Sequence, residues 1–316
     1  MEKLVDRYLR DGPLANLPIH RQQHAFQSGR STESALHQLV GRIERALDAG
    51  QHALGAFFDI QGAFDNTPLL SVKQALAERD VILAVRQWIS AMITQRTVSV
   101  GVGQNTIQVD VLSGLPQGGG LSPTLRSLVA DSLLHWFTKQ GAFAVGFADD
   151  GLILIVGRVL YTMCEIMHHL PQRIEKWCTD RDLSVNPIKT ILMLFTRKYK
   201  PDVISPIYFY NKLSELSTQV KYLGVILYPI LNWKLHIKNK CDKALRSFYQ
   251  LRSSVGKRWR VTPKVCTWMY TAVIRPMITY AAVVWWPRVD KITAGCHAIG
   301  LCVKLKMSQL LKLWNE

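Results

Sequence analysis

The 316-residue chain lacks the patterns that mark several classes of protein. Its six cysteines form no Cys-x-x-Cys pair, and no Cys/His cluster has zinc-site spacing, so we expect free thiols in a reducing compartment. The N-terminal residues do not have the layout of a signal peptide. The most apolar segment, residues 272–286, is short and contains Arg275 and Pro276, which argues against a membrane span. There is no internal repeat and no low-complexity tract.

Acidic residues are scarce in the second half of the chain. Residues 151–316 carry 26 Lys and Arg against 9 Asp and Glu, whereas residues 1–150 carry 13 against 14. The whole chain has a formal net charge of +16, and its 48% hydrophobic content is that of a globular protein. A near-neutral half followed by a strongly basic half favours a catalytic body with an extension that binds a polyanion, over a merely basic surface.

Two short acidic motifs stand in the near-neutral half. The first, residues 58–65, reads FDIQGAFD and follows an apolar run. The second, residues 147–150, reads FADD and lies between the apolar runs 142–147 and 152–156. This second pattern predicts a strand, a tight turn and a strand, with two carboxylates at the turn.

The carboxylates of these motifs suit a metal site. Adjacent carboxylates repel each other, and burial near a sheet favours their protonated form, whereas a divalent cation removes both penalties. Each of Asp59, Asp149 and Asp150 alone reads more simply as a polar residue at a strand end. Together, each beside its own apolar strand, they predict a site for Mg²⁺-dependent phosphoryl transfer, in which two cations clamp the attacking and leaving oxygens.

The rest of the chain alternates helical and strand patterns, which indicates a mixed fold of α/β or α+β type. Residues 31–34 (STES) predict a capped helix start, and Gly50 predicts its end. The charged, proline-containing connector 198–206 suggests a domain boundary. We expect helices over residues 1–18 (interrupted), 31–49, 68–78, 83–95, 124–139, 161–181, 233–259 and 263–274. We expect strands over residues 52–58, 183–186, 191–196 and 220–227, and a hairpin over 97–111.

Residues 114–123 (GLPQGGGLSP) form a Gly/Pro-rich loop. Its glycines allow the backbone to approach a ligand closely, and Gln117 offers an amide to a base, sugar or phosphate. Taken alone, this loop is equally consistent with a plain connector.

In combination, these segments resemble the reverse transcriptases of non-LTR (LINE-type) retrotransposons, especially the arthropod ribosomal-DNA-inserting and jockey-like groups. The resemblance implies an α+β, right-hand polymerase fold, with fingers and palm over residues 1–227 and a basic helical thumb over 228–293. Residues 294–316 do not look like the family and form an atypical tail. The matching stretches occur in the family's order and are residues 24–32, 58–65, 114–123, 147–150, 183–190 and 220–227.

The resemblance implies catalytic roles for several of these residues. Asp59 and Asp149 would bind two catalytic ions, Mg²⁺ or Mn²⁺, with Asp150 as the second carboxylate of the pair. The backbone carbonyl of Ile60 would be a further metal contact. Lys189 looks like the lysine near the leaving pyrophosphate, where it would serve as a general acid.

Other residues match the family's nucleotide site. Phe64 resembles the steric gate, where a bulky ring excludes a ribose 2′-OH, although by itself it reads as a core residue. Gln117 and Gly118 would contact the incoming nucleotide, and Arg30 would reach the triphosphate or the template.

The resemblance also implies the partners of the chain. Tyr222, Leu223 and Gly224 resemble the primer grip, and the basic helices after residue 233 would follow the template–product duplex through its phosphates. The expected reaction is RNA-directed DNA polymerisation, in which dNTPs are added to a DNA primer on an RNA template. Nuclear action is implied, with no membrane partner.

The chain departs from the family pattern at several positions. Phe147 replaces the more usual Tyr, residues 228–230 replace a turn that more often contains Asp, and Arg126 stands where a large apolar residue is expected. If Arg126 is buried, it is costly unless it is paired. The sequence begins just after an expected fingers segment, and no endonuclease domain precedes it, so we expect a chain truncated at both ends.

Three functions are compatible with these observations. The first is a working reverse transcriptase, which the intact aspartate trio favours. The second is an inactive retroelement remnant that only binds nucleic acid, which the missing fingers segment favours. The third is a phosphodiesterase that uses the same carboxylates. It is the weakest of the three, since Phe64 and Gln117 would then have no role.

Overall fold

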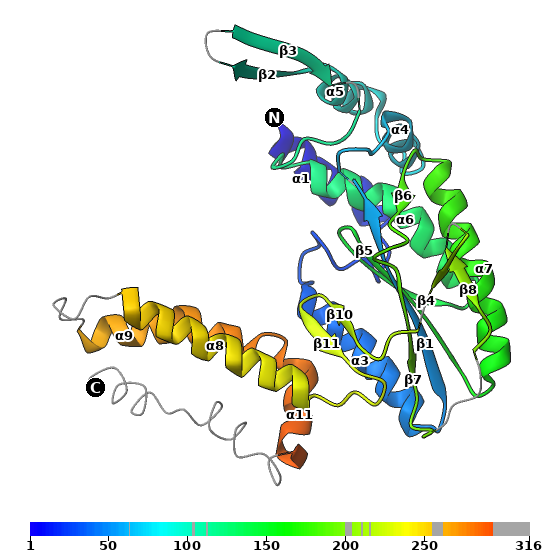
Figure 1. Ribbon diagram of the computed structural model, residues 1–316. Coiled ribbons are helices and arrows are strands. Elements are labelled where there is room, and N and C mark those ends of the chain that lie inside the picture. Colours follow the sequence, from blue (N-terminus) through cyan, green and yellow to red (C-terminus); the bar gives the residue numbers. More distant parts are fainter. Residues whose placement is uncertain are drawn as a thin grey trace. The chain divides into compact units, whose positions relative to one another are not determined.

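A computed structural model describes residues 1–62, 64–102, 105–111, 113–199, 204–209, 211–214, 216–254 and 262–292 (Figure 1). The chain divides into two compact units, Met1–Ser217 and a second that begins at Thr218. The predicted boundary between palm and thumb at residues 227 and 228 stays a prediction, since a compact unit and a functional subdomain need not coincide. The predicted tail, residues 294–316, lies outside the described residues.

The centre of the first unit is a five-stranded sheet in the order β4-β5-β1-β6, with β7 also paired to β1 (Figure 1). All of its pairings are antiparallel. The central strand pairs with β5 along its length, from His52 opposite Gly157 to Asp59 opposite Asp150. The strands are β1 (His52–Gln61), β4 (Phe143–Phe147), β5 (Asp150–Gly157), β6 (Ser184–Val185) and β7 (Ile191–Phe195).

Helices cover the sheet because its strands are apolar on both faces. Alternate residues of β1, from Leu54 to Ile60, join one core cluster with buried residues of α6 (Ser122–Lys139) and α7 (Leu160–Thr179). The helix α3 (Thr32–Asp48) also contacts β1, β4 and β5. It begins with the predicted cap, because Ser31 and Ser34 exchange side-chain and backbone hydrogen bonds.

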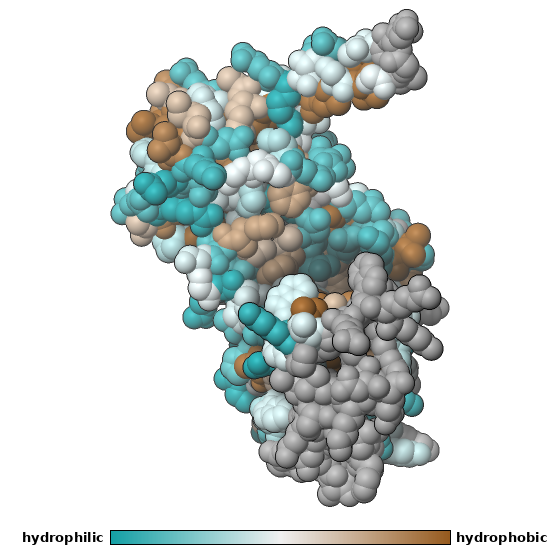
Figure 2. Space-filling model, turned by 90° about the vertical axis from the view of Figure 1, so that its left-hand side faces the viewer, coloured by the Kyte–Doolittle hydropathy of each residue, from teal (hydrophilic) through white to brown (hydrophobic). Residues whose placement is uncertain are grey.

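The other elements of the first unit agree with the predicted segments, apart from the unpredicted strands β8 and β9. The hairpin of β2 and β3 pairs Val98 with Val109 and Val100 with Ile107, and all four side chains are exposed. Figure 2 shows apolar side chains along this hairpin at the top of the view. The elements are α1 (Glu2–Asp11), α2 (Pro13–Asn16), α4 (Leu69–Ala77), α5 (Leu83–Thr94), β2 (Arg96–Val102), β3 (Asn105–Val111), β8 (Ile207–Phe209) and β9 (Lys212–Ser214).

The second unit combines a small hairpin with helices. The single strand predicted over residues 220–227 is wrong, because Leu223 and Gly224 have positive φ angles of 43° and 76° and turn the chain between β10 (Val220–Tyr222) and β11 (Val225–Leu227). The remaining elements are α8 (Lys234–Ser254), α9 (Pro263–Met269), the π-helical segment η1 (Tyr270–Ile274), α10 (Arg275–Thr279) and α11 (Ala282–Ile292). None of the helices described in either unit is long and apolar enough to cross a membrane.

Candidate active site

The second acidic motif forms the turn between β4 and β5. Ala148, with a φ angle of 53°, and Asp149 connect the two strands, so Asp150 is the first residue of β5 and not part of the turn itself. Asp150 lies opposite Asp59 in the register with β1. The backbone carbonyl of Asp149 accepts a 3.0 Å hydrogen bond from the amide of Ile60. The sheet therefore brings the three predicted aspartates to one end of β1.

A glycine makes this close approach of the strands possible. Gly151 directly follows Asp150 in β5 and lies opposite Phe58, the residue that directly precedes Asp59 in β1. A Cβ atom on Gly151 would lie 2.3 Å from two carbon atoms of the Phe58 ring. The ring occupies the space that any other side chain at position 151 would need.

Charge repulsion and burial destabilise the ionised carboxylates at this end of the sheet. Burial raises the pKa of Asp149, and the charges of Asp59 and Asp65 raise it further, while Arg126 acts in the opposite direction. Burial also raises the pKa of Asp150, with additional contributions from Asp59 and Asp149. The site therefore concentrates negative charge that a cation would stabilise.

Lys189 supplies one positive charge to this site. Its ammonium group donates a 2.8 Å hydrogen bond to Oδ2 of Asp59, and this contact raises the pKa of Lys189. Asn186 positions the lysine. Its side-chain Oδ1 accepts hydrogen bonds from the backbone amides of Ile188 and Lys189, and its own backbone amide donates to the carbonyl of Asp59. The turn between β6 and β7 is thus attached to the end of β1.

The residues present fit a divalent cation in their chemistry. Within the described residues, no group of three or more His, Cys, Asp or Glu side chains has the arrangement of a metal site. However, Oδ1 of Asp149 is buried and has no hydrogen-bond partner among the described residues. Carboxylate oxygens are the ligands that Mg²⁺ prefers, and a cation would offset the repulsion among Asp59, Asp149 and Asp150.

The Gly-rich loop is attached to the segment that follows β1. The amide of Leu115 donates to the carbonyl of Phe64 at 2.7 Å, and Nε2 of Gln117 donates to Oδ1 of Asp65 at 2.8 Å. Gly114 has a φ angle of 78°, and a Cβ there would lie 2.2 Å from the carbonyl oxygen of Asp65. Gly118 is also left-handed, with a φ angle of 87°. The loop therefore carries Gln117 next to the first acidic motif.

Phe64 and Arg30 have contacts within the protein. The Phe64 ring is half-buried and packs edge-on against Phe26, with ring centroids 6.2 Å apart. The Arg30 guanidinium donates to the backbone carbonyls of His20 and Gln23 at 3.2 and 2.7 Å, so it stabilises its own loop. The nucleotide-binding roles of both residues stay predictions.

The predicted primer grip belongs to the second unit. Tyr222 is buried at the end of β10, and Leu223 and Gly224 form the turn. The hydroxyl of Tyr280 donates a 2.8 Å hydrogen bond to the carbonyl of Leu223 and thereby fixes the turn from within this unit.

Sequence reasoning gave no role to two residues of this site. Asp65 closes the first acidic motif, and its hydrogen bond to Gln117 links that motif to the Gly-rich loop. Asn186 directly precedes Pro187, and an Asn in front of a proline commonly accepts hydrogen bonds from the backbone of the turn that follows. This Asn-Pro pair is the sequence signal that could have revealed its role.

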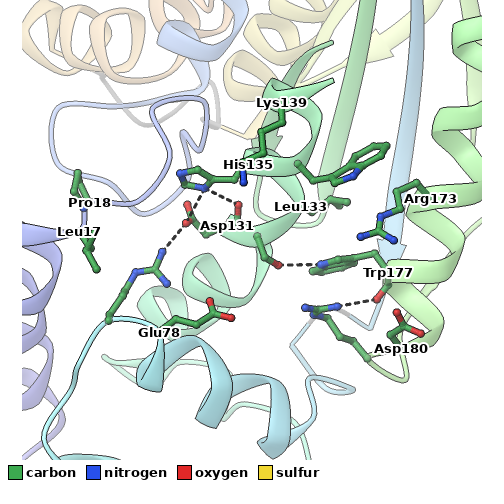
Figure 3. A pocket seen from close by; sticks show the side chains of 14 residues that line it. Leu17, Pro18, Glu78, Asp131, Leu133, His135, Lys139, Arg173, Trp177 and Asp180 are labelled. Carbon is green, nitrogen blue, oxygen red and sulfur yellow. Dashed lines mark hydrogen bonds and ion pairs between the residues drawn. The ribbon is translucent and has the colours of Figure 1, made fainter. Parts of the chain in front are cut away.

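A separate cavity of about 620 Å³ in the first unit is lined by none of the predicted site residues (Figure 3). One of its charged groups has several partners: Asp131 accepts hydrogen bonds from Arg79 and from the amide of His20, and lies 3.1 Å from Nδ1 of His135. Trp177 donates to Ser132, also in the cavity wall. These contacts join α6 to Arg79 after α4, to α7 and to the N-terminal segment.

Comparison with solved structures supports the predicted fold. Telomerase from Candida albicans, in complex with a fragment of telomeric RNA, matches with a TM-score of 0.50 and 13% identity, over 99% of this chain and 55% of that one. At this identity the likeness concerns the fold alone, and it agrees with the α+β, right-hand polymerase fold that the sequence predicts.

Sequence comparison identifies relatives among mobile elements. The chain is 25% identical to a probable RNA-directed DNA polymerase from transposon BS of Drosophila melanogaster, over 90% of this chain and 32% of that protein. It is 26% identical to the Pol polyprotein of the type-1 retrotransposable element R1 of Bradysia coprophila, over 87% of this chain and 27% of that protein. The chain thus spans about a third of the length of these relatives.

A family model described as reverse transcriptase (RNA-dependent DNA polymerase) matches residues 1–227. This range contains both acidic motifs, the Gly-rich loop and Lys189. The resemblance that the motif order predicts is therefore confirmed, and the chain belongs to the reverse transcriptase family.

Proposed function

We propose that this chain is the polymerase part of a retrotransposon reverse transcriptase, which extends a DNA primer with dNTPs on an RNA template. The observation that carries the proposal is the convergence of Asp59, Asp149, Asp150 and Lys189 at one end of the central sheet. Family membership supplies the reaction class, and these residues have the chemistry that nucleotidyl transfer requires.

In this proposal the carboxylates bind the catalytic cations. Asp59 and Asp149 hold two Mg²⁺ or Mn²⁺ ions, with Asp150 and the carbonyl of Ile60 as further contacts. The ions supply positive charge where negative charge develops on the phosphoryl oxygens. Lys189 has a raised pKa and is protonated at neutral pH, so it can donate a proton to the departing pyrophosphate.

The same proposal assigns substrate selection to the segment after β1. Phe64 is held by Phe26 and by the hydrophobic core, which limits its freedom to move away from a ribose 2′-OH. Gln117 and Gly118 contact the incoming nucleotide, and Arg30 supports this region from its loop. The basic second half binds template and primer through phosphates, with Tyr222, Leu223 and Gly224 at the primer, and we expect this action to occur in the nucleus.

One observation favours the alternative, a chain that only binds nucleic acid. Arg126 is fully buried and its charge acts on Asp149, so a protein cation already lies near a carboxylate that the reaction needs. In the alternative, Arg126 has replaced the catalytic cations. Measured polymerase activity separates the two functions.

The test is primer extension by the whole chain on an RNA template with a DNA primer, dNTPs and Mg²⁺ or Mn²⁺. We expect extension by the parent and a loss of about a thousandfold in Asp149→Asn, because one cation loses its ligand at constant side-chain volume. Asp11→Asn makes the same chemical change at an exposed residue of α1 and serves as the matched control, with unchanged activity expected.

The outcomes distinguish the two functions. Extension by the parent that Asp149→Asn lacks supports the polymerase and its metal site. Normal extension by Asp149→Asn contradicts the assignment of the site. If neither protein extends the primer but both bind template–primer in a salt-sensitive manner, the chain is a nucleic-acid-binding remnant.

A further inference from the structure

Arg126 is buried inside the first unit. It belongs to α6, its side chain is only 1% exposed, and none of its three guanidinium nitrogens has a hydrogen-bond partner among the described residues. A buried guanidinium is strongly destabilising unless a counter-charge and acceptors lie near it. The position therefore requires an anionic neighbour.

Asp149 is that neighbour. It is the carboxylate whose charge acts most strongly on Arg126. Its buried Oδ1 atom has no hydrogen-bond partner in the part of the chain that the structure describes, and the same holds for Oε1 of Gln23. All three residues line one small cavity of about 30 Å³ beneath the acidic turn, together with Phe58 and Gly151.

The cavity matches the bonding capacity of a water molecule. A space of roughly 10–15 Å³ is enough for one water if polar partners surround it. A water donates two hydrogen bonds and accepts others, and here the two acceptors are Oδ1 of Asp149 and Oε1 of Gln23, while Arg126 is the donor. The backbone bridge between Gln23 and Gly146 keeps the amide beside β4.

We propose that Arg126 is a positioning residue for the polymerase reaction: through water in this cavity it holds the inner oxygen of Asp149 and leaves the outer oxygen for the cation. The inference rests on the proposed function. Arg126 makes two opposite contributions to the polymerase reaction. The positive charge of Arg126 weakens cation binding at the site, while the fixed carboxylate speeds the chemical step.

These contributions separate Arg126 from a residue that only fills space. A purely structural role changes stability and moves all kinetic parameters together. The proposed role predicts that removing the charge increases affinity for the cation and decreases the rate at saturating cation. The comparison needs a neutral variant of similar length, Arg126→Met, and one that keeps the charge, Arg126→Lys.

The experiment measures Mn²⁺ binding to the whole chain at pH 8 by electron paramagnetic resonance, and primer extension at saturating Mn²⁺. We expect the dissociation constant of Arg126→Met to fall about tenfold and its extension rate to fall about tenfold. Arg126→Lys should retain the parent's cation affinity. Circular dichroism checks folding, and Arg126→Gln replaces the Met variant if that variant does not fold.

Asp149→Asn defines which Mn²⁺ binding belongs to this site. If binding depends on Asp149 but is unchanged or weaker in a folded neutral variant, the inference about Arg126 is overturned and the metal site stands. If the parent shows no binding that depends on Asp149, the proposed metal site fails and the role of Arg126 fails with it.

Discussion

At the scale of single residues, the shape of the acidic turn depends on Gly151. A Cβ at this position would lie 2.3 Å from the Phe58 ring, which is packed in the core next to Asp59. We expect Gly151→Ala to lower the free energy of unfolding by about 1–3 kcal/mol, because the ring and the paired strands must shift. Urea denaturation measures this change, and primer extension should fall with it because Asp59 and Asp150 move.

Gly41 provides the matched control for that substitution. It lies in the interior of α3, and beyond the neighbouring backbone of its own helix no heavy atom of the described residues lies within 4 Å of an added Cβ. Gly41→Ala should therefore raise the free energy of unfolding by about 0.5–1 kcal/mol. A Gly151→Ala protein as stable as the parent would mean that the sheet tolerates a wider strand separation at the acidic turn.

Sequence motifs indicated which acidic residues the sheet brings together, but not all of their contacts. The two acidic motifs were sufficient to select Asp59, Asp149 and Asp150, and the family pattern added Lys189. The hydrogen bond between Gln117 and Asp65 was not predictable, because it joins residues 52 positions apart through a loop with no periodic pattern. The sequence marked Arg126 as unusual, but only the packing of α6 on the sheet shows that its nitrogens lack partners.

At the scale of elements, His236 links the hairpin of the second unit to α8. Its Nδ1 accepts a hydrogen bond from the amide of Ile226, so the ring is neutral in the folded chain. Burial, with the nearby charge of Lys240, lowers the pKa of His236 to about 4. The unfolded chain, with a pKa near 6.5, binds this proton more readily, so stability is full above pH 6.5 and is lost as the pH falls towards 4.

We therefore expect the free energy of unfolding to fall by about 3 kcal/mol between pH 7.5 and pH 4 through His236 alone. The measurement is urea denaturation at several pH values for the parent and for His236→Asn, whose amide oxygen can accept the same hydrogen bond. The difference in unfolding free energy between the two proteins isolates the effect of the histidine from that of carboxylates that titrate in the same pH range. Parallel pH profiles would show that His236 is not buried in its neutral form.

The long elements were predictable, whereas the three-residue strands were missed or merged. The helices α3 and α7 follow hydrophobic periods, β1 is a continuous apolar run, and Ser31 marks the start of α3. The strands β8 to β11 contain only three residues each, which is too short for a period to be recognised. The turn at Leu223 also lacks the Asn-Gly or Asp-Gly pair that commonly announces a hairpin.

At the scale of the whole molecule, the uneven charge makes the proposed nucleic-acid binding testable. The exposed basic side chains of α8 include Lys238 and Arg246. If they contact phosphates, the double variant Lys238→Glu/Arg246→Glu should weaken template–primer binding. The slope of log affinity against log salt should decrease by about one for each lost contact. Fluorescence anisotropy between 50 and 200 mM salt, as in comparable systems, measures this slope.

The control is Lys73→Glu, an exposed lysine of α4 in the near-neutral half of the chain. It should leave affinity and slope close to those of the parent. Lys73→Glu changes the net charge half as much as the double variant does. A loss of about half the size in the control would therefore mean that net charge, and not the basic helices, determines binding.

The fold class was predictable at this scale, while the contacts that hold the second compact unit together were not. Alternating strands and helices indicate a mixed fold, and the order of the motifs specified the right-hand form. The hairpin of β10 and β11 belongs to the same compact unit as the helices that follow. Contacts such as Tyr280 with Leu223, 57 positions apart, join them, and no local pattern reveals such a contact.

The apolar strip on the hairpin of β2 and β3 affects how the chain can be handled in solution. Val98, Val100, Ile107 and Val109 are each more than half exposed, so concentrated protein will tend to associate through them. Removing nucleic acid from a chain of net charge +16 requires salt, which weakens the phosphate contacts. Sulfate and phosphate would at the same time strengthen apolar association. Purification should therefore use a chloride salt at moderate concentration and keep the protein dilute.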